Sequence, residues 1–172
     1  MELPDLVAAR KDIEGFPGWS EPEPDTGGMW FIAPLSIAGV IQEAFTLHGL
    51  ALKHIPDRNV VFELKVSGPK GRKISIARFE WRSAREGHTN SRRKGSPVSG
   101  MRVNATHYHS FDLNWLSSKH RMRSGNLPQA ASFEPEPDSF ESLTTEIGKL
   151  FRINNMHVVP PPKWEYDMFR HG

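Results

Sequence analysis

The chain has 172 residues and no cysteine, so it has the length of one domain and cannot form disulfides, zinc ribbons, iron–sulfur clusters or a catalytic thiol. No apolar run approaches the ~18 residues of a membrane span, and no basic segment precedes an apolar core as it does in a secretory signal. We therefore expect a cytoplasmic protein with no membrane partner.

The net charge of +2 conceals an uneven distribution of charge along the chain. Residues 1–28 form an acidic N-terminal arm, whereas residues 53–124 carry sixteen Lys and Arg against five acids, a net charge of +11. Such a block is typical of a surface that binds phosphates. We expect one domain over 1–172, in which this basic β region is followed by a packing helix at 139–152 and a Pro- and aromatic-rich tail at 158–172.

Two helices are predicted in the first third of the chain, at 4–14 and at 34–48. Apolar residues recur at helical spacing from Ile37 onward. Pro34 is tolerated in the first turn of such a helix, and Gly49 is suited to end it.

The next segment predicts a β-hairpin. Residues 60–66 alternate between apolar and polar side chains, as in a half-buried strand, and a turn at 67–71 leads to a return strand at 73–81. Apolar residues change parity between Ile76 and Phe79 in the return strand, which predicts either a β-bulge or an edge strand with both faces covered.

The strongest alternation in the sequence predicts a strand over 103–115. Further on, Asp138 and Glu141 form a variant of the capping box, and the apolar stripe that follows predicts the helix 139–152. The predicted fold class is therefore α+β, a curved antiparallel sheet packed by two amphipathic helices, 34–48 and 139–152, with long basic loops.

The acidic pentapeptide Glu-Pro-Glu-Pro-Asp occurs at 21–25 and again at 134–138. The sequences on either side of the two copies do not match, so a duplicated domain is not predicted. Both copies are stiff and negatively charged, which makes them candidates to cover the basic block when no ligand is bound.

His107 and His109 are two residues apart, so both side chains point to one face of the predicted strand. Three interpretations stay open for this pair. With His88, His120 or Asp112 as a third ligand it forms a metal site; buried and hydrogen-bonded it is structural; and near phosphate-binding arginines it performs acid–base catalysis. We favour catalysis by His88, His107 and His109 with no metal and no cofactor.

Two basic loops flank the predicted histidine strand, and their cations are the candidate ligands for nucleic-acid phosphates. Hydroxyl and amide side chains between His88 and Arg92 supply the hydrogen bonds that position a phosphate. The candidate nucleic-acid-binding residues are Arg85, Arg92, Arg93, Lys94, Arg102, Lys119, Arg121 and Arg123.

The run from His88-Thr89-Asn90 to His107-Tyr108-His109, followed by the helix at 139–152, resembles small uncharacterised bacterial and phage proteins related to the TumE-like toxins of toxin–antitoxin systems. The resemblance covers about residues 59–153. It implies a small antiparallel sheet with a late basic or His-x-His strand and a C-terminal amphipathic helix. It also implies an RNA-directed toxin or a component of a defence system.

The favoured function is nucleic-acid binding, with RNA preferred over DNA, in a toxin–antitoxin or phage-defence context, together with histidine-assisted cleavage of the phosphodiester. A non-catalytic interaction or anti-defence subunit that docks on a nucleoprotein complex is the alternative, and a protein partner then covers the basic surface. A metal-dependent small-molecule enzyme that uses His107 and His109 is the second alternative.

Overall fold

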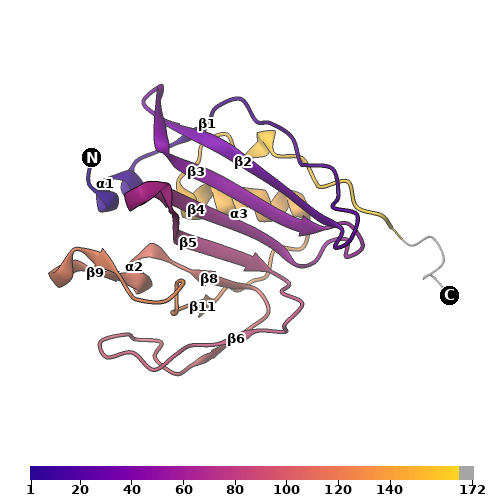
Figure 1. The fold of residues 1–172 in the computed structure, drawn as a ribbon. Coiled ribbons are helices and arrows are strands. Elements are labelled where there is room, and N and C mark those ends of the chain that lie inside the picture. The colour runs from indigo at the N-terminus through magenta and orange to yellow at the C-terminus, as the bar shows by residue number, and fades with distance from the viewer. Residues whose placement is uncertain (167–172) are drawn as a thin grey trace.

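The computed structural model describes residues 1–166, and it has an α+β architecture built on an antiparallel sheet (Figure 1). The strands are β1 (Asp12–Ile13), β2 (Gly28–Ile37), β3 (Val40–Leu52), β4 (Val60–Ser67), β5 (Lys73–Trp81), β6 (His88–Thr89), β7 (Arg102–Val103), β8 (His107–His109), β9 (Trp115–Leu116), β10 (Arg121–Met122) and β11 (Ala131–Ser132). The α-helices are α1 (Leu3–Ala8), α2 (Phe111–Asn114) and α3 (Phe140–Phe151), and the 3₁₀ helices are η1 (Pro69–Gly71), η2 (Ser117–Lys119) and η3 (Met156–Val158). Within residues 1–166, no helix has the length and apolar character needed to cross a membrane.

Seven strands form the main sheet in the order β1-β2-β3-β4-β5-β8-β11, and every neighbouring pair is antiparallel. The pairs β6–β7 and β9–β10 belong to two small separate sheets. Figure 1 shows the segment from β6 to β11 beside the β5 edge of the large hairpins. The α+β class and the antiparallel sheet are thus confirmed.

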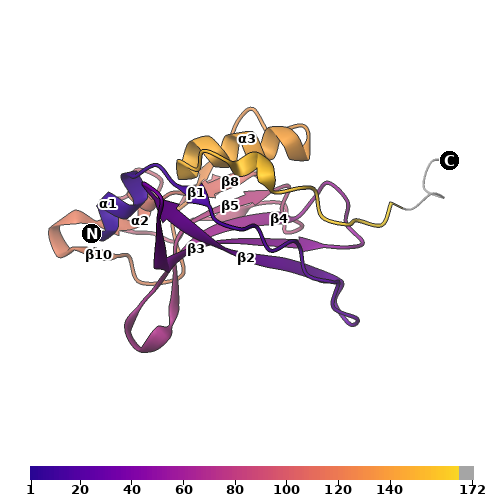
Figure 2. The same ribbon diagram turned by 90° about the horizontal axis from the view of Figure 1, so that it is seen from above.

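Helix α3 covers one face of the sheet, as Figure 2 shows from above. Its buried side chains include Phe140, Leu143 and Ile147, which recur at helical spacing and turn toward the sheet. The N-cap is Ser139 and not Asp138: its hydroxyl accepts a hydrogen bond from the backbone N–H of Ser142, whose own hydroxyl accepts one from the Ser139 N–H.

The prediction of a helix at 34–48 is wrong, because this segment forms most of the β2–β3 hairpin. Ile37 pairs with Val40 across a two-residue turn, in which Ala38 and Gly39 both have positive φ values, 49° and 76°. Two central residues with positive φ give the backbone twist that matches paired strands. The β-branched side chains on both sides of the turn also favour strands, although their spacing fits a helix.

Gly49 is a strand residue opposite Phe31 and does not end a helix. A Cβ atom at Gly49 would lie 2.2 Å from a ring carbon of Phe31, so only glycine leaves room for this ring. Phe31 in turn lies 6.2 Å from Phe62 on β4, and Phe62 lies 6.3 Å from Phe140 on α3, between ring centroids. The space between the sheet and α3 is therefore the aromatic core of the protein.

Strands β4 and β5 confirm the predicted hairpin and its bulge. Leu64 pairs with Ala77, but Lys65 pairs with Ser75, so Ile76 is the extra residue on β5. The bulge accounts for the change of parity along this strand, because one unpaired residue reverses the faces of the side chains that follow it.

The prediction of a continuous strand over 103–115 is also wrong. The segment divides into β7, β8, α2 and β9, and the hydroxyl of Ser110 caps α2. Phe111 and Asn114, three residues apart, are the buried residues of α2. Beyond His109 the buried positions therefore follow the spacing of a helix and not the alternation of a strand. The histidines themselves do lie on a strand, β8.

The two ends of the chain also differ in part from the sequence predictions. The helix predicted at 4–14 is limited to α1, and the predicted tail begins within the short 3₁₀ helix η3, to which Val158 belongs. In the Pro- and aromatic-rich tail, Trp164 is buried with its ring centroid 5.8 Å from that of Phe140, whereas Phe169 lies outside the described residues.

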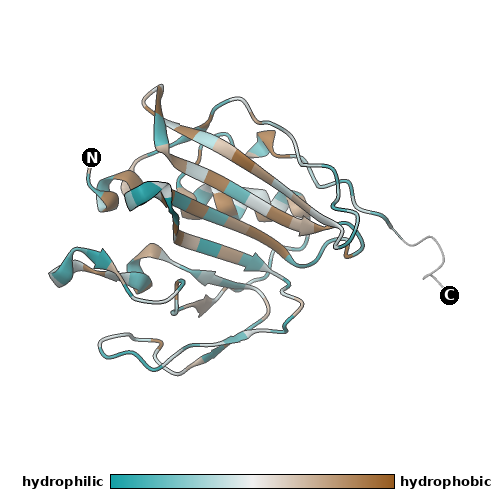
Figure 3. Cartoon of the chain, in the orientation of Figure 1, coloured by the Kyte–Doolittle hydropathy of each residue, from teal (hydrophilic) through white to brown (hydrophobic). Residues whose placement is uncertain are grey.

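The face of the sheet opposite α3 is turned toward the viewer in Figure 1, and Figure 3 shows the alternating hydropathy along its strands. Trp30 and Leu50 are cross-strand partners, both are exposed, and their neighbours Met29 and Ala51 are buried. Trp30 and Leu50 therefore lie on the face without a helix, which we call the helix-free face. This face also carries the candidate site.

The first prediction concerns the packing of α3. Ile147→Ala removes a fully buried side chain, and we expect the free energy of unfolding to fall by ~2–5 kcal/mol. Thr145→Ala, an exposed change on the same helix, should alter it by no more than about 0.5 kcal/mol. Urea denaturation followed by circular dichroism measures both values, and wild-type stability of Ile147→Ala would contradict a structural role of this face of α3.

Candidate functional site

The register between β5 and β8 places the two histidines next to charged residues of the sheet. His107 pairs with Glu80, and His109 pairs with Arg78. Tyr108 between them packs on the α3 side, with its ring centroid 6.1 Å from that of Phe151. Because successive residues of a strand point to opposite faces, both histidines lie on the helix-free face with Glu80 and Arg78.

Glu80 and the two histidines converge on one point. Nε2 of His107 lies 3.7 Å from one carboxylate oxygen of Glu80, and Nε2 of His109 lies 3.7 Å from the other. Among the residues that the structure describes, these three are the group of histidine and acidic side chains whose ligand atoms all lie within 4.8 Å of one another. The histidines are only 1% and 2% exposed, whereas Glu80 is partly open to solvent.

Both histidine rings are held by hydrogen bonds from Nδ1. Nδ1 of His107 donates to the carbonyl of Asn104 over 2.8 Å, and Nδ1 of His109 donates to the carbonyl of Leu127 over 2.7 Å. A carbonyl oxygen can only accept, so these contacts place the proton of each ring on Nδ1. Each Nε2 is thereby directed toward Glu80.

His88 completes the cluster from a different segment. The β6–β7 pairing brings His88 opposite Val103, just ahead of the histidine strand. Its ring centroid lies 5.9 Å from that of His107 and 5.1 Å from that of His109. Within residues 1–166, Nε2 of each of the three histidines is buried without a hydrogen-bond partner. We call Glu80, His88, His107 and His109 the His–Glu cluster.

The environment of the His–Glu cluster shifts two pKa values. The neighbouring His107 ring is the main cause that lowers the pKa of Glu80 to about 2, against the opposing effect of burial. Burial is the main cause that lowers the pKa of His109 to about 3, and His107 adds to it. At neutral pH, Glu80 is therefore ionised and the His109 ring is neutral.

Buried amides fasten the loops around the His–Glu cluster. The Asn90 side chain donates to the carbonyls of Val98 and Ala130 and accepts from the Ala130 N–H. Gln129 is held in a similar way, since its backbone N–H donates to the Asn114 side chain. These bonds join the loop that carries His88 to the segment whose carbonyl orients His109.

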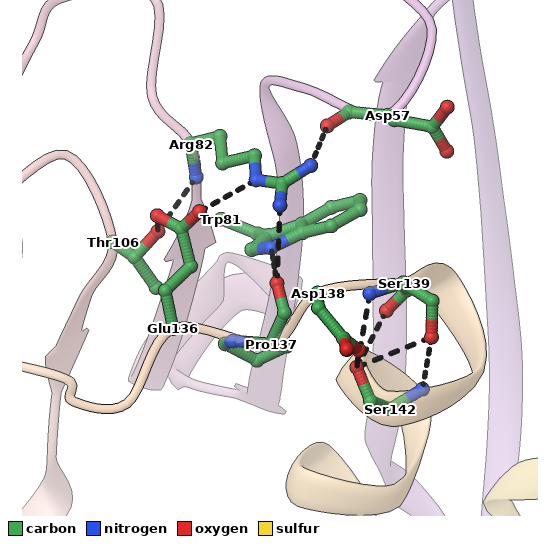
Figure 4. A network of polar contacts seen from close by, with 9 residues as sticks. All are labelled: Asp57, Trp81, Arg82, Thr106, Glu136, Pro137, Asp138, Ser139 and Ser142. Carbon is green, nitrogen blue, oxygen red and sulfur yellow. Dashed lines mark hydrogen bonds and ion pairs between the residues drawn. The ribbon is translucent and has the colours of Figure 1, made fainter.

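The second Glu-Pro-Glu-Pro-Asp segment, 134–138, holds the chain just ahead of β8 (Figure 4). Glu136 accepts hydrogen bonds from Nε of Arg82 and from the hydroxyl of Thr106, both over 2.7 Å. This acidic segment thus contacts the basic block at Arg82. Because Thr106 directly precedes His107, the same contacts fix the start of the histidine strand.

A basic cleft adjoins the segment whose carbonyl holds His109. It has a volume of about 880 Å³ and is formed by the β4–β5 turn and residues 122–127. Among the described residues that line it, none is acidic. Its charged lining residues are Lys65, Lys70, Arg72, Lys73 and Arg123. Leu127 also lines the cleft, and its carbonyl holds His109, so the cleft and the His–Glu cluster share a wall.

The structure brings together some of the predicted phosphate-binding cations. Arg123 lines the cleft and donates to the carbonyl of Lys94, while Arg93 donates to the carbonyl of Ser124, so the two predicted basic loops are in contact. The predicted cations that are not among the lining residues of the cleft are Arg85, Arg92, Arg93, Lys94, Arg102, Lys119 and Arg121.

Glu80 was not among the predicted site residues. It is the third member of the group with His107 and His109, in place of the proposed third ligands His88, His120 and Asp112. The sequence does show Glu80 as an acid between two aromatic residues of a predicted strand. Its pairing with His107, however, depends on the register between β5 and β8. The cations of the β4–β5 turn were missed as well. Their signal was the run Lys70, Arg72 and Lys73 in a turn, which by itself is typical of a solvated loop.

No family model matches this chain, and neither a curated protein nor a solved structure matches it. The resemblance to TumE-like toxins therefore stays a prediction. The candidate site is defined by its own geometry, namely the His–Glu cluster and the basic cleft beside it.

The second prediction concerns the buried amides. Asn90→Ala leaves the backbone N–H and the carbonyl of Ala130 without their side-chain partner and removes one of the two donors to the Val98 carbonyl, so we expect the free energy of unfolding to fall by ~1–3 kcal/mol. Asn126→Ala, an exposed change in the neighbouring segment, serves as the matched control. Equal denaturation midpoints for Asn90→Ala and the wild type would show that this amide does not hold the loops together.

Proposed function

We propose that this protein binds single-stranded RNA in the basic cleft and cleaves it at the neighbouring His–Glu cluster. The observation that carries the proposal is the shared wall at Leu127: this residue lines a cleft with five cationic side chains, and its carbonyl orients His109. A phosphate chain bound in the cleft would thereby lie next to a group of histidines and a carboxylate.

The cleft suits a polyanion because its cations are largely uncompensated. Lys70, Arg72 and Lys73 are exposed, and of these Lys73 donates to the hydroxyl of Ser67 rather than to an acid. Lys65 is the member with an acidic neighbour, since its Nζ lies 3.6 Å from Glu63. Neutralisation of several phosphates by such cations supplies most of the affinity of non-specific nucleic-acid binding.

The exposed side chains of the helix-free face favour single-stranded RNA as the ligand. Cross-strand pairing places Trp30, Leu50 and Val61 in one row that continues through Glu80 to His107. At about 4.8 Å per strand, Trp30 lies roughly 19 Å from His107. Exposed aromatic and apolar side chains on a sheet stack unpaired bases, which a duplex keeps inside its helix.

The His–Glu cluster has the chemical groups that phosphodiester cleavage requires. Nε2 of a histidine in the cluster can take the proton from an attacking oxygen and give it to the leaving oxygen, and the ionised carboxylate of Glu80 stabilises the ring while it is protonated. Arg78, whose guanidinium lies 4.0 Å from Glu80, supplies a positive charge for the developing negative charge on phosphate. A cleavage role for His88, His107 and His109 is thus a proposal that their positions support.

The third prediction tests RNA binding. Replacement of both Lys70 and Arg72 by Ala should weaken the binding of single-stranded RNA at least tenfold. It should also reduce the slope of log Kd against log salt concentration by about 1.4, because two phosphate contacts are lost. Filter binding at several salt concentrations measures both quantities, and the wild type should bind a duplex of the same length less tightly.

The matched control replaces Lys149 and Lys163 by Ala. Both lysines are exposed and far from the cleft residues in the sequence, and this double variant loses the same net charge as the Lys70 and Arg72 variant. Equal losses in both double variants would mean that net charge alone attracts RNA. Absence of binding by the wild type at low salt would reject the proposed function.

The fourth prediction tests cleavage. Glu80→Gln keeps the size and polarity of the side chain but removes its charge, and we expect the cleavage rate to fall by at least ~100-fold with RNA binding retained. Glu86→Gln, an exposed change of the same type, should leave the rate unchanged. Gel analysis of labelled RNA provides the measurement, and an RNA that the wild type binds but leaves intact would reject the catalytic part of the proposal.

A further inference from the structure

We propose that Glu80, His107 and His109 bind a divalent transition-metal ion, for which Zn²⁺ is the best match. Two imidazoles and one carboxylate form a ligand set found in catalytic zinc sites, which keep a further position open. The histidine pair was predicted to act without a metal, and the structure adds the carboxylate that the pair lacked. The metal site follows from the geometry of these three residues and does not depend on RNA binding.

The orientation of the two rings is the first argument. Nδ1 of each ring donates to a backbone carbonyl, so Nε2 of a neutral ring carries a lone pair directed into the cluster. Metal-binding histidines in proteins almost always donate their second ring N–H to a carbonyl, carboxylate or water in this way. The carbonyls of Asn104 and Leu127 therefore have the positions of outer-sphere partners of a metal site.

The position of the carboxylate is the second argument. Each Nε2 lies 3.7 Å from a different oxygen of Glu80. This exceeds hydrogen-bond length, but it is near the separation of roughly 3.3 Å between neighbouring ligands of a tetrahedral ion with bonds of ~2.0–2.1 Å. The three ligand atoms converge within 4.8 Å, so small side-chain movements complete the coordination.

The buried polar atoms without partners are the third argument. The Nε2 atoms of His107 and His109 and the carboxylate of Glu80 converge in a largely buried site, and neither Nε2 has a hydrogen-bond partner within residues 1–166. Buried polar atoms without partners are unfavourable. A divalent ion satisfies both rings and the carboxylate at once, and the partly exposed Glu80 leaves a path for its entry.

His88 lies beside the proposed metal and not among its three closest ligands. Its buried Nε2 has no hydrogen-bond partner within residues 1–166, and its ring lies 5.1 Å from that of His109. It is therefore the imidazole of the His–Glu cluster that stays available to transfer a proton when the ion is bound. If the ion is used in cleavage, which rests on the proposed function, it acts as a Lewis acid on a phosphodiester that the cleft presents.

The test is a titration of the chelator-treated, full-length protein with Zn²⁺ against a chromophoric chelator. We expect one ion per chain, and Glu80→Gln and His109→Gln should each weaken its binding by more than about tenfold. His120→Gln removes an imidazole outside the cluster and is the matched control, with affinity equal to the wild type. Binding of one ion should also raise the thermal unfolding temperature of the wild type.

X-ray absorption of the zinc-loaded protein should show nitrogen and oxygen ligands at ~2.0–2.1 Å, two of them imidazoles. Absence of stoichiometric binding, or equal affinity of Glu80→Gln and the wild type, would overturn the proposal. If His109→Gln does not fold, the nearly isosteric Glu80→Gln decides. The double variant Lys70→Ala, Arg72→Ala should bind Zn²⁺ normally, so the metal site and the RNA site can fail separately.

Discussion

The antiparallel pairing of β8 with β5 is the constraint on which the candidate site depends. Three residue pairs set this register, and they place Glu80 opposite His107 and Arg78 opposite His109. A shift by one residue would turn Tyr108 toward the helix-free face and both histidines into the core, because side chains alternate along a strand. The Tyr108 ring opposes this shift by packing against Phe79 of β5 and Phe151 of α3.

The two faces of the sheet have different roles. One face packs its aromatic core against α3, where Phe31, Phe62 and Phe140 form a continuous contact, and this packing stabilises the fold. The opposite face holds the His–Glu cluster and the apolar row that begins at Trp30. Rigid strands thus position the chemical groups, while the covered face supplies the stability that holds them.

Long loops complete the site, and polar contacts hold them in place. The segment between β5 and α3 contributes His88 and the carbonyl of Leu127, yet much of it lacks regular secondary structure. Buried Asn90 and Gln129 link its parts through hydrogen bonds. Such networks favour one geometry because each unsatisfied buried group is costly. The loops are therefore suited to hold ligands at fixed positions.

Local periodicity alone predicts α3 and the β4–β5 hairpin, including the bulge at Ile76, and it also places His107 and His109 on one face of a strand. The segment around Ala38 and Gly39 shows where it fails. Its apolar spacing fits a helix, but pairing over the full length of β2 and β3 makes the hairpin the more stable structure.

Spacing and composition were enough to predict the histidine pair, the basic character of 53–124 and the helix that packs on the sheet. Only the contacts between distant segments make Glu80 the partner of the histidines and bring the β4–β5 turn to residues 122–127 to form the basic cleft. These contacts join residues far apart in the chain through strand register and loop packing. Residue spacing along the chain carries no direct signal of either, since both arise only when separate segments pair.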